Sequence, residues 1–111
     1  MKLTTISTIL ALVVAAPFLG VSRPPQAQKG KAIFQEQCIG CHGADGKAQT
    51  DMGKKVQAAD FTSSAVQEQS DSKLESVIKS GKKKMPSFDA KLSDDEIGSV
   101  VAYVRQIAKG Q

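Results

Sequence analysis

Both cysteines and the only histidine of the 111-residue chain lie in one short stretch, Cys38-Ile39-Gly40-Cys41-His42. The spacing C-x-x-C-H is typical of covalent attachment of a c-type haem. Two thiols three residues apart on a helical turn can bond the two vinyl groups along one side of a porphyrin. The next residue, His42, is then held beneath the iron as an axial ligand. The motif predicts one haem c, attached through Cys38 and Cys41.

Other uses of a cysteine pair fit this chain poorly. A structural zinc site needs four ligands, and the chain has only two Cys and one His. A thioredoxin-like redox pair is expected in a βαβ context, which the sequence does not indicate. A disulfide between Cys38 and Cys41 would close a tiny loop and add little stability. We retain the haem interpretation, with a chance occurrence of the motif as the remaining alternative.

The second axial ligand of the iron is expected to be Met85. The other candidates are Met52, a lysine or an open position. Met52 follows His42 by only ten residues, a segment too short to pass around the haem edge. Met85 lies 43 residues beyond His42 and precedes Pro86, which restricts the loop backbone. Ligation by His and Met leaves no vacant site and favours electron transfer over catalysis.

Residues 1–26 are expected to form a cleavable signal peptide. Lys2 precedes an unbroken apolar run over residues 9–16, which is followed by Pro17. This run has the length of a signal h-region and is far shorter than the roughly 20 residues that span a bilayer. We expect the cut between residues 22 and 27, which leaves residues 27–111 as one small domain. Membrane contact is expected only if the signal is retained.

Composition limits both the core and the partners. The domain has no Trp and four aromatic residues, so we expect the haem to fill part of its centre: Phe34, Phe61, Phe88 and Tyr103. The formal net charge of +4 falls to +2 without Lys2 and Arg23 of the signal segment. This mild excess does not support nucleic-acid binding, which needs a clustered basic surface.

The first periodic segment predicts a helix over residues 28–39. Gly30 and Phe34 share one face of it, four residues apart. Residues 40–60 have no sustained period and are interpreted as an ordered loop, with one short helix over residues 53–58. No segment of the chain shows a convincing strand pattern.

Two capping boxes mark the later helices. Ser72 and Glu75 have the S-x-x-E spacing, and Gly81 supplies a C-terminal stop to that helix. Ser93 and Glu96 form the second box. The apolar residues that follow it at helical spacing are Ile97, Val100, Val101, Val104, Ile107 and Ala108. The predicted class is all-α, with three main helices and short ones.

These motifs together resemble the class I (monohaem) cytochromes c over residues 29–109, in particular the short photosynthetic and related bacterial periplasmic members. The agreeing stretches are Gly30 and Phe34 ahead of the C-x-x-C-H motif, Met85-Pro86-Ser87-Phe88, residues 92–97, and Tyr103-Val104. The resemblance implies a fold wrapped around one haem, with crossing N- and C-terminal helices. Gly30 and Phe34 would pack against Val100 and Tyr103.

One departure from the family concerns the histidine. Many members have a proline after the haem motif, whose carbonyl accepts a hydrogen bond from the ligand His. This chain has no Pro between His42 and Met85. We expect a backbone carbonyl of residues 50–53 to serve instead. Such partners orient the ligand and tune the metal.

The resemblance implies a soluble, monomeric one-electron carrier, not an enzyme, in the bacterial periplasm or thylakoid lumen. Donor and acceptor would be larger redox complexes, such as a quinol-oxidising complex, a terminal oxidase or a photosystem. Lys82, Lys83 and Lys84 form either a solvated turn or a docking site for an acidic partner. The alternatives are a small haem peroxidase or gas-binding protein, and a haem subunit fixed to a dehydrogenase.

Overall fold

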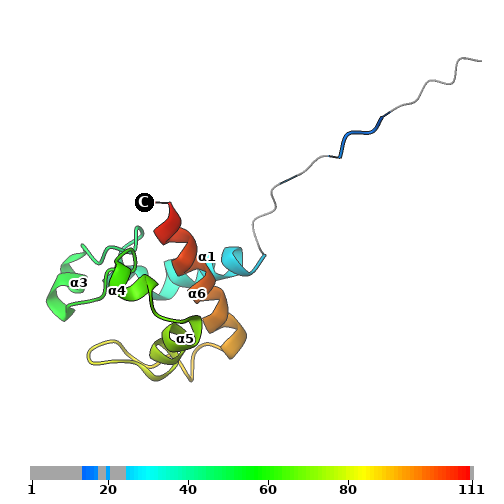
Figure 1. Ribbon diagram of the computed structural model, residues 1–111. Coiled ribbons are helices and arrows are strands. Elements are labelled where there is room, and N and C mark those ends of the chain that lie inside the picture. The colour runs from blue at the N-terminus through cyan, green and yellow to red at the C-terminus, as the bar shows by residue number, and fades with distance from the viewer. Residues whose placement is uncertain (1–13, 18–19, 21–24, 111) are drawn as a thin grey trace, which may run out of the picture.

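The computed structural model describes residues 14–17, 20 and 25–110 (Figure 1). Most of the predicted signal peptide lies outside these residues. The described part contains six helices: α1 (Pro25–Gln37), α2 (Ile39–His42), α3 (Asp51–Val56), α4 (Ser64–Gln67), α5 (Asp71–Ser80) and α6 (Asp94–Lys109). It has no strand, only an isolated bridge between Lys82 and Met85. The all-α prediction is confirmed. None of the described helices combines the length and apolar character that a membrane span requires.

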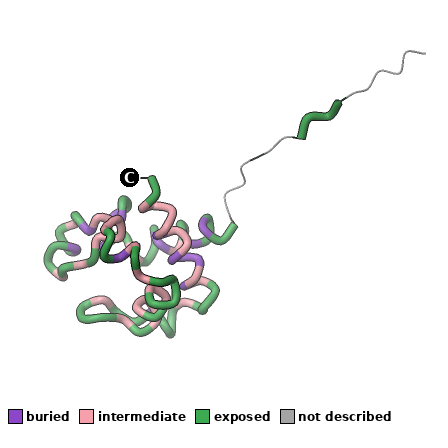
Figure 2. The backbone as a smooth tube through the Cα atoms, in the orientation of Figure 1, coloured by how far each residue is buried: buried purple, intermediate pink, exposed green. Residues whose placement is uncertain are grey.

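Helices α1 and α6 cross at the centre of the molecule, and most of the buried backbone in Figure 2 lies on them. Phe34 is fully buried at the crossing, and its ring centroid lies 5.3 Å from that of Tyr103. A Cβ added to Gly30 would lie 1.8 Å from the backbone oxygen of Ser99. The predicted crossing of the terminal helices, with Gly30 at the contact, is confirmed.

Helix α6 begins with the predicted capping box. The Ser93 hydroxyl accepts from the Glu96 N–H at 3.2 Å, and the Glu96 carboxylate accepts from the Ser93 N–H at 2.8 Å. This reciprocal pair satisfies two N–H groups that a helix start leaves free. The face turned to the core is apolar and buried: Ile97, Val100, Val101 and Val104. Burial of this stripe docks α6 onto α1.

The start of α5 differs from the prediction. Ser70, not Ser72, caps the helix, and its hydroxyl accepts from the Lys73 N–H at 3.1 Å. The capping box predicted at Ser72 and Glu75 is therefore wrong. Both serines have a suitable side chain, and tertiary contacts decide between them. Arg105 of α6 donates to Asp71 at 3.0 Å and so fixes the residue at which the helix begins.

We expect Ser70→Ala to lower the free energy of unfolding by about 1 kcal/mol, because it removes the cap of α5. Ser72→Ala is the matched control. It lies in the exposed first turn and is expected to change stability by less than about 0.5 kcal/mol. Chemical denaturation of the two variants measures the difference. Equal losses would contradict the assignment of the cap.

Three other helix boundaries also differ. Helix α1 begins at Pro25, because proline is tolerated in a first helical turn. It ends at Gln37, and Cys38 separates it from α2. The short helix predicted at 53–58 is α3, two residues earlier, since the Thr50 hydroxyl accepts from the Gly53 N–H at 2.9 Å. Helix α4 had no predicted position.

Candidate haem site

A cavity of about 460 Å³ opens between α2, α5, α6 and the two loops that face them. Cys38, Cys41, His42 and Met85 all line it. The structure thus brings together the four predicted site residues from opposite parts of the chain. Much of the remaining wall is aliphatic: Val56, Val66, Leu74, Val77, Ile78, Val101 and Val104. Its size and apolar character are those of a cofactor pocket.

The two thiols lie at either side of one helical turn. Cys38 precedes α2, and its carbonyl accepts from the His42 N–H at 3.0 Å. Cys41 lies in α2, and neither thiol is in a disulfide. Burial, together with the neighbouring Cys41, raises the pKa of Cys38 to about 11. The Cys38 thiol is therefore neutral at neutral pH.

His42 is 7% exposed, and its Nδ1 lies 3.0 Å from the carbonyl oxygen of Ala59. A carbonyl only accepts, so Nδ1 carries the proton and Nε2 is left with a free lone pair. Burial lowers the pKa of His42, and the bond to Ala59 partly opposes that shift. The neutral imidazole with one fixed tautomer is the form that ligates a metal.

The acceptor of this bond was predicted wrongly among residues 50–53. Thr50 instead donates its hydroxyl to the carbonyl of Gly40 at 2.8 Å. Gly53 packs so closely that an added Cβ would lie 2.1 Å from the Cys41 oxygen. Because α3 rests on the backbone of α2, the carbonyl that reaches the imidazole comes from the loop after α3.

Phe61 is a second contact of His42 that the sequence analysis did not assign to the site. Its ring stacks on the imidazole, with centroids 4.1 Å apart and an angle of 17° between the planes. The Phe61 N–H donates to the carbonyl of Gly46 at 2.8 Å. Only the folding of the 43–61 loop brings Phe61 to His42, so no local sequence pattern could have indicated it.

Acid is expected to weaken the turn at Asp60. Thr62 donates its hydroxyl and its N–H to Asp60 Oδ1, each at 2.7 Å, and these bonds hold the pKa of Asp60 below its usual range. Because the folded pKa is the lower one, this stabilisation is complete above about pH 4 and is lost as the pH falls through the folded pKa. Asp60→Asn should therefore make the free energy of unfolding depend less steeply on pH in this acid range. Denaturant titrations of both proteins over this pH range measure it; identical slopes would contradict the assignment.

Met85 lies at the end of a tight turn. The Met85 N–H donates to the Lys82 carbonyl at 2.9 Å, and the Lys82 N–H donates to the Met85 carbonyl at 3.1 Å. Lys83 has φ of 53°, a left-handed conformation that costs a non-glycine residue roughly 1 kcal/mol or more. At Gly81, an added Cβ would lie 2.7 Å from the Met85 oxygen. The backbone of the turn that carries Met85 therefore has little conformational freedom.

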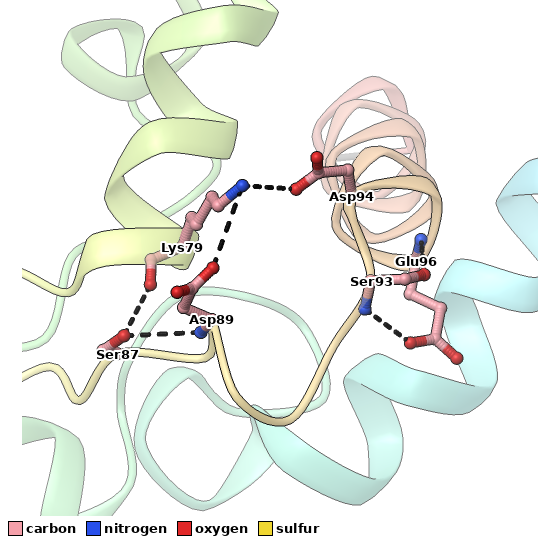
Figure 3. A network of polar contacts seen from close by, with 6 residues as sticks. All are labelled: Lys79, Ser87, Asp89, Ser93, Asp94 and Glu96. Carbon is pink, nitrogen blue, oxygen red and sulfur yellow. Dashed lines mark hydrogen bonds and ion pairs between the residues drawn. The ribbon is translucent and has the colours of Figure 1, made fainter.

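The chain after Met85 is tied to two helices, as Figure 3 shows. The Ser87 hydroxyl donates to the Lys79 carbonyl at 2.6 Å, and the Asp89 N–H donates to the same oxygen at 3.1 Å. The Lys79 ammonium pairs with Asp94 at 2.7 Å. Exposed ion pairs contribute little energy, but these contacts hold the Met85 loop between the end of α5 and the start of α6.

Met52, the other candidate methionine, lies on α3 outside the cavity and is 50% exposed. Lys82, Lys83 and Lys84 are exposed residues that line the cavity next to Met85. Over residues 14–17, 20 and 25–110, no three His, Cys, Asp or Glu side chains are grouped to hold a metal ion. The sulfur and imidazole groups that line the cavity are the thiols of Cys38 and Cys41, the imidazole of His42 and the thioether of Met85.

Comparison with known proteins extends these observations. The family model described as "Cytochrome C oxidase, cbb3-type, subunit III" matches residues 25–104. Cytochrome c6 of Chlorolobion braunii is 31% identical over 86 residues, which are 73% of this chain and 90% of that protein. The chain belongs to the class I cytochrome c family. Family membership makes it a haem-based electron carrier.

Three further proteins are similar to this class I cytochrome c. Cytochrome c6 of Leptolyngbya boryana is 32% identical over 78 residues, 70% of this chain and 88% of that protein. The "Cbb3-type cytochrome c oxidase subunit FixP" of Rhizobium meliloti (strain 1021) is 30% identical over 90 residues, 81% of this chain; the match spans only 30% of FixP. A solved structure, "KustC0563 c-type cytochrome", has a TM-score of 0.65 and 31% identity, covering 70% of this chain and 95% of that chain.

Haem c, covalently attached, is the cofactor of class I cytochromes c, and the residues of the cavity fit it. The two thiols are free, the imidazole has an unprotonated Nε2, and the thioether of Met85 lines the same cavity. The aliphatic wall suits the apolar faces of a porphyrin.

Proposed function

We propose that this chain is a soluble one-electron carrier in which Cys38 and Cys41 hold one haem c and His42 and Met85 ligate its iron. The observation that carries the proposal is that these four side chains line one largely apolar cavity. The cytochrome c6 relatives support a free domain, because the chain matches 90% and 88% of their lengths.

The residues around the site have distinct roles in this proposal. When bound, the haem supplies an iron that cycles between the ferric and ferrous states. The Ala59 carbonyl accepts a hydrogen bond from the His42 Nδ1–H and leaves Nε2 as the ligating nitrogen. The thioether of Met85 would favour the ferrous state of the iron and so raise its potential. With His42 and Met85 both holding the iron, oxygen and peroxide would find no vacant site, which favours a carrier over an enzyme.

The test is the mass and the redox spectra of the protein purified from a host that attaches haem c. The expected mass corresponds to one haem and to a signal cut between residues 22 and 27, after export to the periplasm or thylakoid lumen. The ferric spectrum should contain the weak red-edge band of an iron–thioether bond. Binding of carbon monoxide by the ferrous protein at neutral pH would instead support a peroxidase or gas-binding function.

A second candidate function is a haem domain held in a membrane complex. The similarity to FixP and the match to an oxidase subunit model favour it. The match spans only 30% of FixP, so the similarity concerns one part of that protein. Recovery of the protein as a free monomer supports the diffusing carrier, whereas co-purification in a fixed complex supports the subunit.

Reversing the charge of Lys83 and Lys84 to Glu is expected to slow association with an acidic redox partner by tenfold or more at low salt, on the order of electrostatic steering effects. The two lysines lie on the rim of the cavity, where an electron would leave the haem. Salt should reduce the difference, because it screens exposed charges. Stopped-flow kinetics over a range of ionic strength measures both effects.

The control for this charge reversal is the pair Lys31→Glu and Lys109→Glu. It changes the net charge equally, but neither lysine lines the cavity. Lys31 instead borders a separate shallow groove beside Tyr103. If both double variants slow association equally, net charge governs the encounter and the lysine rim is not a docking site.

A further inference from the structure

Arg105 of α6 is bound by the segment that joins α4 to α5. Its Nη1 donates to the Gln67 carbonyl at 2.8 Å and to the Gln67 side-chain oxygen at 3.2 Å. Its Nη2 donates to the Gln69 carbonyl, and its Nε donates to Asp71 at 3.0 Å. The Arg105 side chain is only 23% exposed. Nearly all of the guanidinium is therefore used to fix this one segment.

Gln67 passes this constraint to the loop that faces the haem cavity. A guanidinium only donates hydrogen bonds, so it selects the oxygen of the Gln67 amide. The amide nitrogen must then point the other way, where it donates to the Phe61 carbonyl. Arg105 thereby fixes the orientation of the amide that holds Phe61.

Phe61 is the point at which this chain of contacts reaches His42. Its ring stacks on the imidazole with the centroids 4.1 Å apart, and the Ala59 carbonyl two residues earlier accepts a hydrogen bond from His42 Nδ1 at 3.0 Å. The loop has two further anchors: the Phe61 N–H donates to the Gly46 oxygen, and the Phe61 ring packs on Phe34 with the ring centroids 6.0 Å apart. No proline restricts it, because none occurs between His42 and Met85.

We propose that Arg105 and Gln67 are positioning residues for His42, which hold the Ala59–Phe61 segment against the imidazole and so tune the reduction potential of the haem. The inference rests on the proposed function, in that His42 is taken to ligate the iron. A strong Nδ1–H bond to a carbonyl makes the imidazole a better electron donor. It stabilises the ferric state, so weakening the bond should shift the potential to a more positive value.

The test uses the haem-loaded protein and the variant Gln67→Met, which has similar length and no charge but cannot hydrogen-bond to Phe61. We expect a more positive potential, a changed pattern of ferric haem hyperfine shifts, and severalfold faster hydrogen exchange of the His42 Nδ1 proton in the ferrous protein. Arg105→Lys keeps the charge and should move the same three readouts in the same direction. The iron–thioether band should be retained in both.

Gln106→Met is the matched control, since it makes the same substitution beside Arg105 at a residue outside the cavity. It should leave the potential, the hyperfine shifts and the exchange rate unchanged. If Gln67→Met folds with a lower Tm but has an unaltered potential, unaltered hyperfine shifts and an unaltered exchange rate, Gln67 is merely structural and the proposal is overturned. Failure of the proposed function is seen separately, because the wild-type protein would then lack the spectrum of His and Met ligation.

Discussion

Met85→Ala is expected to abolish the iron–thioether band of the ferric protein and to let the ferrous iron bind carbon monoxide. The substitution removes the proposed second axial ligand and leaves that face of the iron open. It should also lower the potential by on the order of 0.1 V or more, a fraction of the roughly 0.8 V that axial ligands can span, since the thioether favours the ferrous state. Absorption spectra and a potentiometric titration measure these effects.

The control is Met52→Ala. Met52 is half exposed on α3 and does not line the cavity. Its loss should therefore leave the iron–thioether band, the reduction potential and the response to carbon monoxide unchanged. Persistence of the band in Met85→Ala would exclude Met85 as the source of the thioether. A band lost without carbon monoxide binding would indicate that another group, such as one of the adjacent lysines, occupies the position.

Gly30→Ala is expected to cost about 3 kcal/mol of the free energy of unfolding, at the upper end of what overpacking costs. The added Cβ would lie 1.8 Å from the oxygen and 2.4 Å from the carbonyl carbon of Ser99. Both atoms are backbone in the middle of α6, so no side chain can turn aside, and the helices must separate. Separation also loosens the packing of Phe34 on Tyr103.

Such a loss should lower the Tm by roughly 12–24 °C, because each kcal/mol corresponds to about 4–8 °C in a domain of this size. Gly98→Ala is the control. It lies in α6 itself, and the nearest atom to its new Cβ is a Glu75 carboxylate oxygen at 3.6 Å. This variant should be more stable by about 0.5–1 kcal/mol, from helix propensity alone. A Gly30→Ala loss below about 1 kcal/mol would contradict the close crossing.

The last helix could be predicted from the sequence because its signals are local. The Ser93–Glu96 box lies within four residues, and the apolar stripe of α6 follows it without interruption. The start of α5 could not be predicted, because the local S-x-x-E pattern favours Ser72 whereas the structure uses Ser70. The choice between them involves Arg105, which is 34 residues away from Asp71.

The haem site likewise combines residues that a local pattern predicts with contacts that depend on the folded chain. The C-x-x-C-H motif is contiguous, so Cys38, Cys41 and His42 could be named together from the sequence. The Ala59 carbonyl could not be, because any residue has one and only the path of the loop decides which carbonyl reaches the imidazole. The contacts of Phe61 with His42 and of Arg105 with Gln67 likewise depend on the completed fold.

The packing of α1 against α6 also constrains the order of assembly. Phe34 and Val104 meet in the core although about 70 residues separate them, and bringing together residues so far apart in the chain costs loop-closure entropy and slows folding. The core therefore cannot close until α6 has been synthesised and released into the compartment where the protein folds. During that delay Cys38 and Cys41 remain accessible. The expected sequence of events is attachment of the haem to an open chain, followed by closure of the two helices.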